Sequence, residues 1–411
     1  MHLHAVGTPH GVSTPIIGRL ASAPIAASEG RGDCIAFVTG TNFAAFGNDF
    51  AGYAGVFSPQ EIQEQDAPNA PHVVGCSNLE YVRDGDVLLL LPSGTVTVLY
   101  RKSSPYNAIL TTERCNSLCL MCSQPPKTID DSFRVQQILR LIELIDTDCK
   151  EIGITGGEPS LLGEDFLAII RKLKLSLPNT SVHVLSNGRL FKNRGFAERL
   201  GAIRHPDLML GIPLYSDIDF QHDFVVQAKG AFDETLLGLY NLAACEVPLE
   251  IRVVVHRQTY RRLPELAEFI YRNLPFAAHV ALMGMEMFGY VHLNLGTLWI
   301  DPVEYCAELE EATLNLALHG MNVSVYNHQL CTIPQSVWPF AKKSISDWKN
   351  VYLDVCNSCG VREFCGGFFQ SATKRHSAHI RALDNPWRLK NDAENSLRLR
   401  DPCIGTVSTG T

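Results

Sequence analysis

The sequence lacks the features that mark membrane and secreted proteins. No apolar run approaches the roughly 18 residues that a membrane-spanning helix needs, and the densest apolar stretch, residues 87–92, is only as long as a strand. The N-terminus has no basic flank followed by an apolar core, so no secretory signal is predicted. These absences predict a cytoplasmic protein without a membrane partner, in a compartment that keeps thiols reduced.

An excess of basic residues and several common catalytic motifs are also missing. The 411 residues include 35 Lys and Arg against 43 Asp and Glu, so the net charge is −8. This balance makes nucleic acid an unexpected partner, because proteins that follow its backbone usually carry a basic surface. No GxSxG, HExxH or GxxxxGK[ST] pattern occurs, so serine hydrolase, zincin and P-loop functions lack support.

What the chain does have is a regular alternation of short apolar strands and amphipathic helices after residue 105. Six strand–helix units can be counted, which predicts an α/β fold with parallel strands joined by crossover helices. Six units are too few for a closed eight-fold barrel, so an open doubly wound sheet and a partial barrel both fit. In either fold, ligands gather at the carboxyl ends of the strands.

The expected elements of this region can be given as residue ranges. We expect strands at 106–112, 151–155, 182–186, 208–214, 249–256 and 279–283. We expect helices at 133–145, 165–175, 196–200, 232–245, 263–273 and 303–318. Asp131 and Ser132 are the expected caps of the first helix.

The regions before and after this alternation differ in texture. Residues 1–100 carry short apolar runs between Gly, Pro, Asn and Asp, which predicts a β-rich N-terminal region. This region is a candidate for docking an extended peptide by strand addition. The core is expected at 101–320, a Cys-rich region at 321–385 and a loose tail at 386–411.

The thirteen cysteines are unevenly distributed, and three of them form a tight group. Cys115, Cys119 and Cys122 have the spacing CxxxCxxC and follow a predicted strand directly. In a reducing compartment such a group indicates metal or cluster ligation rather than disulfides. Three thiolates on one loop can hold three corners of a [4Fe–4S] cluster and leave one iron open. A zinc knuckle completed by a distant ligand and simple packing are the alternatives.

A second motif, Gly156-Gly157-Glu158-Pro159, follows the next predicted strand. CxxxCxxC followed by GGEP one strand–helix unit later resembles the radical S-adenosylmethionine (SAM) superfamily. The resemblance implies a partial (β/α)6 TIM-like barrel. It also implies that the open iron chelates the amino and carboxylate groups of SAM, and that the GGEP motif holds the methionyl amino group.

Other positions are carried over from the same superfamily. The resemblance implies that Ser186 and Asn187 face SAM at the end of the third strand, and that Arg252 pairs with the SAM carboxylate. Met121 stands where many members have an aromatic residue beside the adenine, and a thioether can also pack on an adenine face. His222 is more simply a structural histidine than a substrate contact.

Four further cysteines, Cys331, Cys356, Cys359 and Cys365, could complete one closed site near the C-terminus. Four thiolates suit either a second [4Fe–4S] cluster or a structural zinc. The stretch resembles the auxiliary-cluster extensions of radical SAM peptide-modifying enzymes. The next cysteine of that motif is replaced by Phe369, so one auxiliary cluster is expected rather than two. Cys403 is a spare candidate ligand.

The sequences around the two cysteine groups, ERCNSLCLMCSQPPK and VCNSCGVREFCGGFF, are specific enough to indicate a branch of the superfamily. It resembles the HxsC-type maturases of the bacterial His-Xaa-Ser system. The resemblance implies an enzyme that reductively cleaves SAM to a 5′-deoxyadenosyl radical and modifies a peptide or small protein with His-Xaa-Ser repeats. It further implies a partner radical SAM protein, a small accessory protein and an electron donor such as flavodoxin or ferredoxin. The alternatives are a radical SAM enzyme acting on a small molecule or RNA, and a zinc-binding interaction module.

Overall fold

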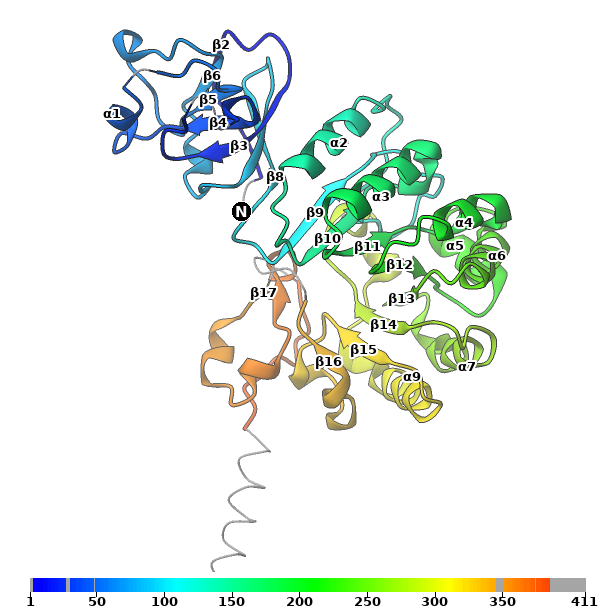
Figure 1. Cartoon of the computed structure of the whole chain (residues 1–411). Coiled ribbons are helices and arrows are strands. Elements are labelled where there is room, and N and C mark those ends of the chain that lie inside the picture. Colours follow the sequence, from blue (N-terminus) through cyan, green and yellow to red (C-terminus); the bar gives the residue numbers. More distant parts are fainter. Residues whose placement is uncertain (1–2, 27–29, 48, 345–349, 374, 385–411) are drawn as a thin grey trace, which may run out of the picture.

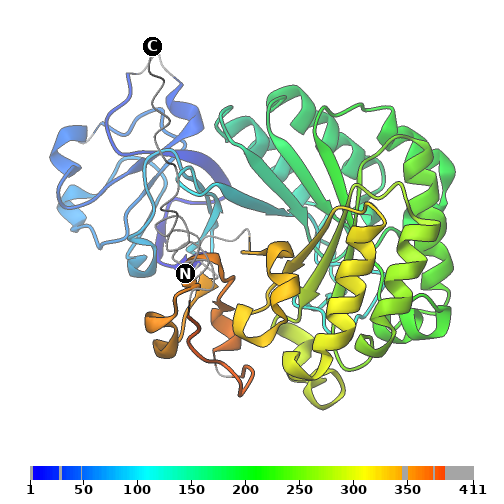
Figure 2. The ribbon, with the colours of Figure 1, turned by 90° about the horizontal axis from the view of Figure 1, so that it is seen from below.

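The computed structural model describes residues 3–384 apart from 27–29, 48, 345–349 and 374. The expected tail and Cys403 lie outside these described residues. Two eight-stranded sheets organise the chain, one in the N-terminal region and one in the core (Figure 1). The Cys-rich extension, with the small β17 (Asn350–Val351) and β18 (Phe368–Phe369) pair, lies beside the core sheet (Figures 1 and 2).

The N-terminal sheet has the order β1-β8-β7-β3-β4-β5-β6-β2. Its strands are β1 (His4–Val6), β2 (Thr8–His10), β3 (Ile16–Ala21), β4 (Cys34–Phe37), β5 (Gly55–Phe57), β6 (His72–Val74), β7 (Val87–Leu90) and β8 (Thr95–Tyr100). The two edge strands, β1 and β2, are consecutive in the chain and separated only by Gly7. The sheet is therefore curled, so that its two edges come together at Gly7. A side chain at Gly7 would not fit, because its Cβ would lie 2.2 Å from the Val74 carbonyl oxygen.

This topology confirms the β-rich N-terminal region and bears on peptide docking there. Each outer strand of the sheet is three residues long, so strand addition to it could form only a few hydrogen bonds. Docking of a peptide by this region stays a prediction.

The core sheet is parallel throughout, with the order β16-β15-β14-β13-β12-β11-β10-β9. Its strands are β9 (Tyr106–Leu110), β10 (Glu151–Thr155), β11 (Ser181–Leu185), β12 (Leu208–Pro213), β13 (Leu249–Val255), β14 (His279–Gly284), β15 (Val323–Tyr326) and β16 (Ala341–Lys342). In the described residues β9 and β16 do not pair with each other, so the barrel is partial, as the sequence pattern predicts.

Helices cover the convex face of this curved sheet (Figure 2). They are α2 (Arg134–Leu144), α3 (Glu164–Ser176), α4 (Arg194–Gly201), α6 (Ala231–Ala244), α7 (Leu263–Asn273) and α9 (Cys306–Leu318). Two shorter helices, α5 (Asp219–Val226) and α8 (Leu295–Leu298), pack instead in an apolar cluster with Met121. Because side chains alternate along a strand, Ile152 and Ile154 are fully buried under helices, whereas Glu151, Gly153 and Thr155 point to the concave face. The concave face is therefore free to form a site.

Three details of the core differ from the expectation. β15 and β16 continue the sheet beyond residue 320, where the end of the core was expected, and α5 was not expected as a helix. The proposed caps of the first helix are wrong: α2 has Phe133 at its N-cap position and no side chain caps it. No helix in the described part of the chain has the length and apolar character needed to cross a membrane.

Candidate functional site

The first cysteine group lies on the loop that leaves the carboxyl end of β9. The loop is held by backbone hydrogen bonds: Leu118 N donates to Val226 O at 3.0 Å, and Leu120 N donates to Val225 O at 2.9 Å. Within the loop, Cys122 N donates to Cys119 O at 3.0 Å. The cysteines are therefore fixed against the end of α5, at the sheet edge where ligands are expected.

Asp131 fixes the start of this loop instead of capping a helix. Its carboxylate has no exposed surface and accepts hydrogen bonds from Thr112 Oγ1 at 2.9 and 3.0 Å and from Glu113 N at 2.6 Å. Arg114 Nε donates to the same carboxylate at 3.1 Å. The three residues immediately before Cys115 are thus held by one buried side chain.

The two sequence motifs meet directly. Gly157 N donates to Thr112 O at 2.7 Å, and Glu158 N donates to Arg114 O at 2.8 Å. A Cβ at Gly156 would lie 2.5 Å from Thr112 O, and a Cβ at Gly157 would lie 2.1 Å from Arg114 O. Both glycines are required because the end of β10 packs against the cysteine loop with no room for a side chain.

The Glu158 carboxylate joins the end of β10 to the end of β11. It is fully buried and accepts hydrogen bonds from Ser160 Oγ at 2.5 Å, Ser186 Oγ at 2.7 Å and Asn187 N at 2.6 Å. Burial raises the pKa of this carboxyl despite these hydrogen bonds. The predicted roles of Glu158 and Ser186 in holding SAM stay predictions, and in this structure their polar atoms bond each other.

Asn187 connects the third strand to the cysteines. Its Nδ2 donates to Asn116 Oδ1 at 2.6 Å and lies 3.9 Å from Cys115 Sγ. Arg189 Nη1 donates to Ser117 Oγ at 3.1 Å, while its Nε donates to Glu234 at 2.7 Å. The sequence pattern did not predict Asn116 or Arg189 as site residues. Their only signal was position, since both lie on loops at the carboxyl ends of strands.

An apolar cluster covers one side of the cysteine loop. It contains Met121, Tyr215 and Met287, with Cys119 partly buried against it. Met121 is 8% exposed, so its thioether packs inside this cluster. His222 is buried behind Tyr215, with Nδ1 3.3 Å from Tyr215 N, and burial lowers its pKa to about 4. A neutral, buried imidazole fits the structural role that the sequence favoured.

The pKa values of the loop cysteines are raised, so their thiols need a positively charged partner in order to ionise. Burial raises the pKa of Cys115 to about 11 and that of Cys119 to about 12, and the neighbouring thiols add to both shifts. Thiols with raised pKa values ionise readily only beside a bound metal ion, whether iron or zinc. No three His, Cys, Asp or Glu side chains converge as ligands of a single ion in the part of the chain that the structure describes. A cluster does not need this, because each thiolate binds a different iron.

Arg252 lies on the concave face of the sheet, in a polar network with Glu250. Arg252 Nη1 donates to Glu250 Oε1 at 2.5 Å, and His279 Nδ1 lies 2.7 Å from Glu250 Oε2. Burial raises the pKa of Glu250, but the His279 contact and the Arg252 charge outweigh it and bring the value to about 2. Whether the guanidinium also binds the SAM carboxylate stays a prediction.

The Glu250 network gives a testable stability effect. Glu250→Gln is expected to lower the free energy of unfolding at pH 7 by about 3 kcal/mol, because it leaves a largely buried guanidinium without its partner. The lowered pKa means that this stabilisation is present above the usual Glu value and is lost as the pH falls from about 4.3 towards 2. Urea denaturation measures the change. The exposed pair Arg194–Glu198 supplies the control Glu198→Gln, expected to shift unfolding by less than about 0.5 kcal/mol; equal shifts would contradict the assignment.

A cavity of about 590 Å³ occupies the concave face next to these residues. Its wall includes Arg252 of the sheet, Ser123 and Gln124 directly after the last loop cysteine, Tyr100 of β8 and Phe369 of the extension. The N-terminal sheet, the core and the extension therefore enclose one space that reaches the cysteine loop.

The second cysteine group is brought together by the fold. Cys331, Cys356, Cys359 and Cys365 line a single cavity in the extension. Burial raises the pKa of Cys331 and Cys365, and the neighbouring thiols raise it further. Residues separated by as many as 34 positions in the chain thus line one cavity, and their ligation of a cluster or of zinc stays a prediction.

A family model matches part of the core. Residues 109–270 match the family model of the Radical SAM superfamily. The GTP 3′,8-cyclase of Petrotoga mobilis is 24% identical over 214 residues, which covers 50% of this chain and 63% of that protein. The chain therefore spans less than two thirds of the length of this curated relative.

Solved structures with a similar fold have low identity. SuiB of Streptococcus suis bound to S-adenosylmethionine has a TM-score of 0.42 and 16% identity, over 54% of this chain and 50% of that chain. Native anSMEcpe with bound AdoMet and the Cp18Cys peptide has a TM-score of 0.47 and 12% identity, over 71% of this chain and 96% of that chain. These scores are too low to support an inference about chemistry.

Proposed function

We propose that this protein is an enzyme that cleaves SAM reductively and modifies a peptide or small protein, because residues 109–270 match the family model of the Radical SAM superfamily. The observation that carries the first part is the contact between the two motifs, in which Gly157 and Glu158 bond the backbone just before Cys115. Cys115, Cys119 and Cys122 would hold the cluster. When bound, a [4Fe–4S] cluster supplies the electron that cleaves SAM to methionine and a 5′-deoxyadenosyl radical.

The chain's own residues bind and orient the cofactor in this proposal. The backbone at Gly156, Gly157 and Glu158, together with Ser186 and Asn187, borders the cysteine loop where the methionyl end of SAM would lie. Met121 and the apolar cluster around it offer a wall for the adenine and exclude water. Arg252 would hold the carboxylate.

Anaerobic reconstitution tests this proposal. We expect about eight irons per chain, with matching sulfide, and formation of 5′-deoxyadenosine when SAM and dithionite are added. Zinc in place of iron, with no cleavage of SAM, would overturn the proposal and favour the zinc-binding interaction module.

The large cavity supports a peptide as the substrate. It is walled by three separate parts of the chain: the N-terminal sheet, the core and the extension. Such a space admits a side chain on an extended backbone. The sequence resemblance extends the proposal to a substrate with His-Xaa-Ser repeats, aided by a partner radical SAM protein, a small accessory protein and flavodoxin or ferredoxin.

A nucleotide substrate is the second candidate, because the curated relative is a GTP cyclase by name. The cavity wall carries three carboxylates, Glu151, Glu250 and Glu286, but only two guanidiniums, Arg101 and Arg252. This balance is a poor match for a triphosphate. We expect a His-Xaa-Ser peptide, and not GTP, to increase 5′-deoxyadenosine formation above the substrate-free rate; stimulation by GTP alone would reverse the ranking.

The cysteines of the extension are proposed to hold a second [4Fe–4S] cluster rather than zinc. Cys356→Ala/Cys365→Ala is expected to lower the iron content from about eight to about four per chain while SAM is still cleaved. Cys245→Ala/Cys306→Ala, at cysteines outside both groups, is the matched control and should keep all the iron. Loss of zinc instead of iron from the first variant would establish the zinc alternative.

A further inference from the structure

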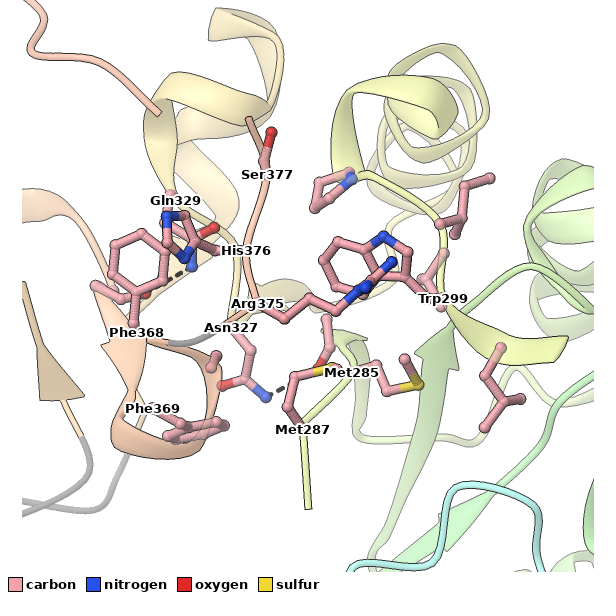
Figure 3. Close-up of a pocket in the computed structure, with 18 of the residues that line it drawn as sticks. Met285, Met287, Trp299, Asn327, Gln329, Phe368, Phe369, Arg375, His376 and Ser377 are labelled. Carbon is pink, nitrogen blue, oxygen red and sulfur yellow. Dashed lines mark hydrogen bonds between the residues drawn. The ribbon is translucent and has the colours of Figure 1, made fainter. Parts of the chain in front are cut away.

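A second cavity lies between the core and the Cys-rich extension and has no assigned role (Figure 3). Met285, Met287 and Trp299 form its wall on the core side, while Phe368 and His376 face them from the extension. The wall is thus rich in sulfur and aromatic groups, which favour contact with an apolar side chain.

In the part of the chain that the structure describes, the wall of this cavity carries a positive charge and no acidic side chain, although the chain as a whole is acidic. No Asp or Glu is among the described residues that line it, but Arg375 is. The Arg375 guanidinium lies 5.1 Å from the centre of the Trp299 ring, and Figure 3 shows it reaching across the cavity. Within the described residues no carboxylate pairs with it. The exposed Arg375 cation therefore lies over an aromatic ring and is available to an anion.

A second polar group in the wall also lacks a partner. His376 Nδ1 is buried and has no hydrogen bond in the described part of the chain. The neighbouring amides are already occupied, since Asn327 Nδ2 donates to Gly284 O at 3.2 Å and Gln329 Nε2 donates to Gly367 O at 2.8 Å. A buried ring nitrogen without a partner carries a cost that a ligand can remove.

The cavity lies between the two cysteine sites. On the core side, Tyr290 N donates to Cys122 O at 2.9 Å, so the segment that begins at Met285 rests on the first cysteine loop. On the other side, Phe368 follows Cys365 closely and also lines the cysteine cavity. Asn327 and Phe369 line both this cavity and the large one on the concave face. A group bound here would lead directly into the proposed substrate space.

We propose that this cavity, of about 50 Å³, binds a carboxylate of the peptide substrate, with Arg375 as its cation and the methionine and aromatic wall in contact with the apolar atoms next to it. Guanidinium and carboxylate form paired, charge-assisted hydrogen bonds, and the absence of acidic residues from the wall leaves no internal competitor. The inference rests on the proposed peptide substrate. It adds that substrate recognition includes an acidic group, which is either a C-terminal carboxylate or an acidic side chain.

Binding of small carboxylate probes to the reconstituted full chain tests the inference. N-acetyl-phenylalanine presents a C-terminal carboxylate, N-acetyl-glutamate α-amide presents a side-chain carboxylate, and N-acetyl-phenylalanine amide presents none. By calorimetry we expect one or both acids to bind and the uncharged amide not to. Arg375→Gln should weaken that binding roughly 10-fold or more. The acid that binds more tightly identifies the source of the carboxylate.

Arg199→Gln is the matched control, because Arg199 also lies over an aromatic ring, 5.6 Å from the centre of Phe196, but is paired with Glu164. It should bind the acids as the wild type does. Equal binding by wild type and Arg375→Gln, equal binding of acid and amide, or preference for inorganic phosphate over both acids would each overturn the inference. Iron content and substrate-free SAM cleavage are measured on the same samples: failure of the proposed function appears as absent cleavage, whereas failure of this inference leaves cleavage intact.

Discussion

A Cys115→Ala/Cys119→Ala/Cys122→Ala variant is expected to lose about four irons per chain and all formation of 5′-deoxyadenosine. The three sulfurs lie on one loop whose backbone is fixed from both ends, by Asp131 at its start and by α5 farther on. No other cysteine of the described residues lies on this loop, so no nearby thiol can replace the missing ligands.

The matched control is Cys34→Ala/Cys245→Ala/Cys306→Ala, which removes three thiols from outside both cysteine groups. This control should keep its iron and its cleavage activity. Iron and sulfide analysis with chromatography of the SAM products measures both quantities. Cleavage of SAM by the loop variant at the wild-type rate would show that the radical chemistry does not take place at this loop.

Gly157→Ala is expected to cause the second large effect, without removing any ligand. Its Cβ would lie 2.1 Å from Arg114 O and 2.6 Å from Arg114 C, and these are backbone atoms that cannot rotate away. The cysteine loop must then move off the end of β10. Since a misplacement of about 1 Å can cost roughly 100-fold in rate, SAM cleavage should fall by at least that factor.

Gly296→Ala provides the comparison, because a Cβ at this glycine would meet nothing within 4 Å. We expect this variant to retain iron, cleavage and thermal stability. If Gly157→Ala also retained full cleavage, the contact between the two motifs would not be what positions the cluster.

The sequence predicted those elements that local periodicity determines. The strand Glu151–Thr155 and the helix Leu263–Asn273 are found at the expected residues, because each carries a clear period of two or of 3.6. β16, with two residues, is too short to show a period, and its place depends on pairing with β15. α5 was missed since its apolar residues face the cysteine loop and the cluster there rather than the main core.

The sequence predicted the motifs of the candidate site but not the hydrogen bonds that join them. The spacing of the cysteines and the GGEP motif are local patterns, and they were read directly. The role of Asp131 was predicted wrongly because an acidic residue before a helix has the same local appearance whether it caps that helix or accepts a hydrogen bond from a loop residue 19 positions earlier. Such partners become visible only when distant segments are packed together.

The strictly sequential order of the core strands has a consequence for how the protein matures. Every hydrogen-bond partner described for the first cysteine loop lies at or before Asn294, whereas the second group begins at Cys331. Chains fold from the N-terminus as they leave the ribosome. The first loop can therefore reach its final shape, ready to receive iron, before the second group of cysteines has been synthesised. Under the proposed function, the loop with Cys115 would then be loaded first, before thiols of the extension could compete for the iron delivered.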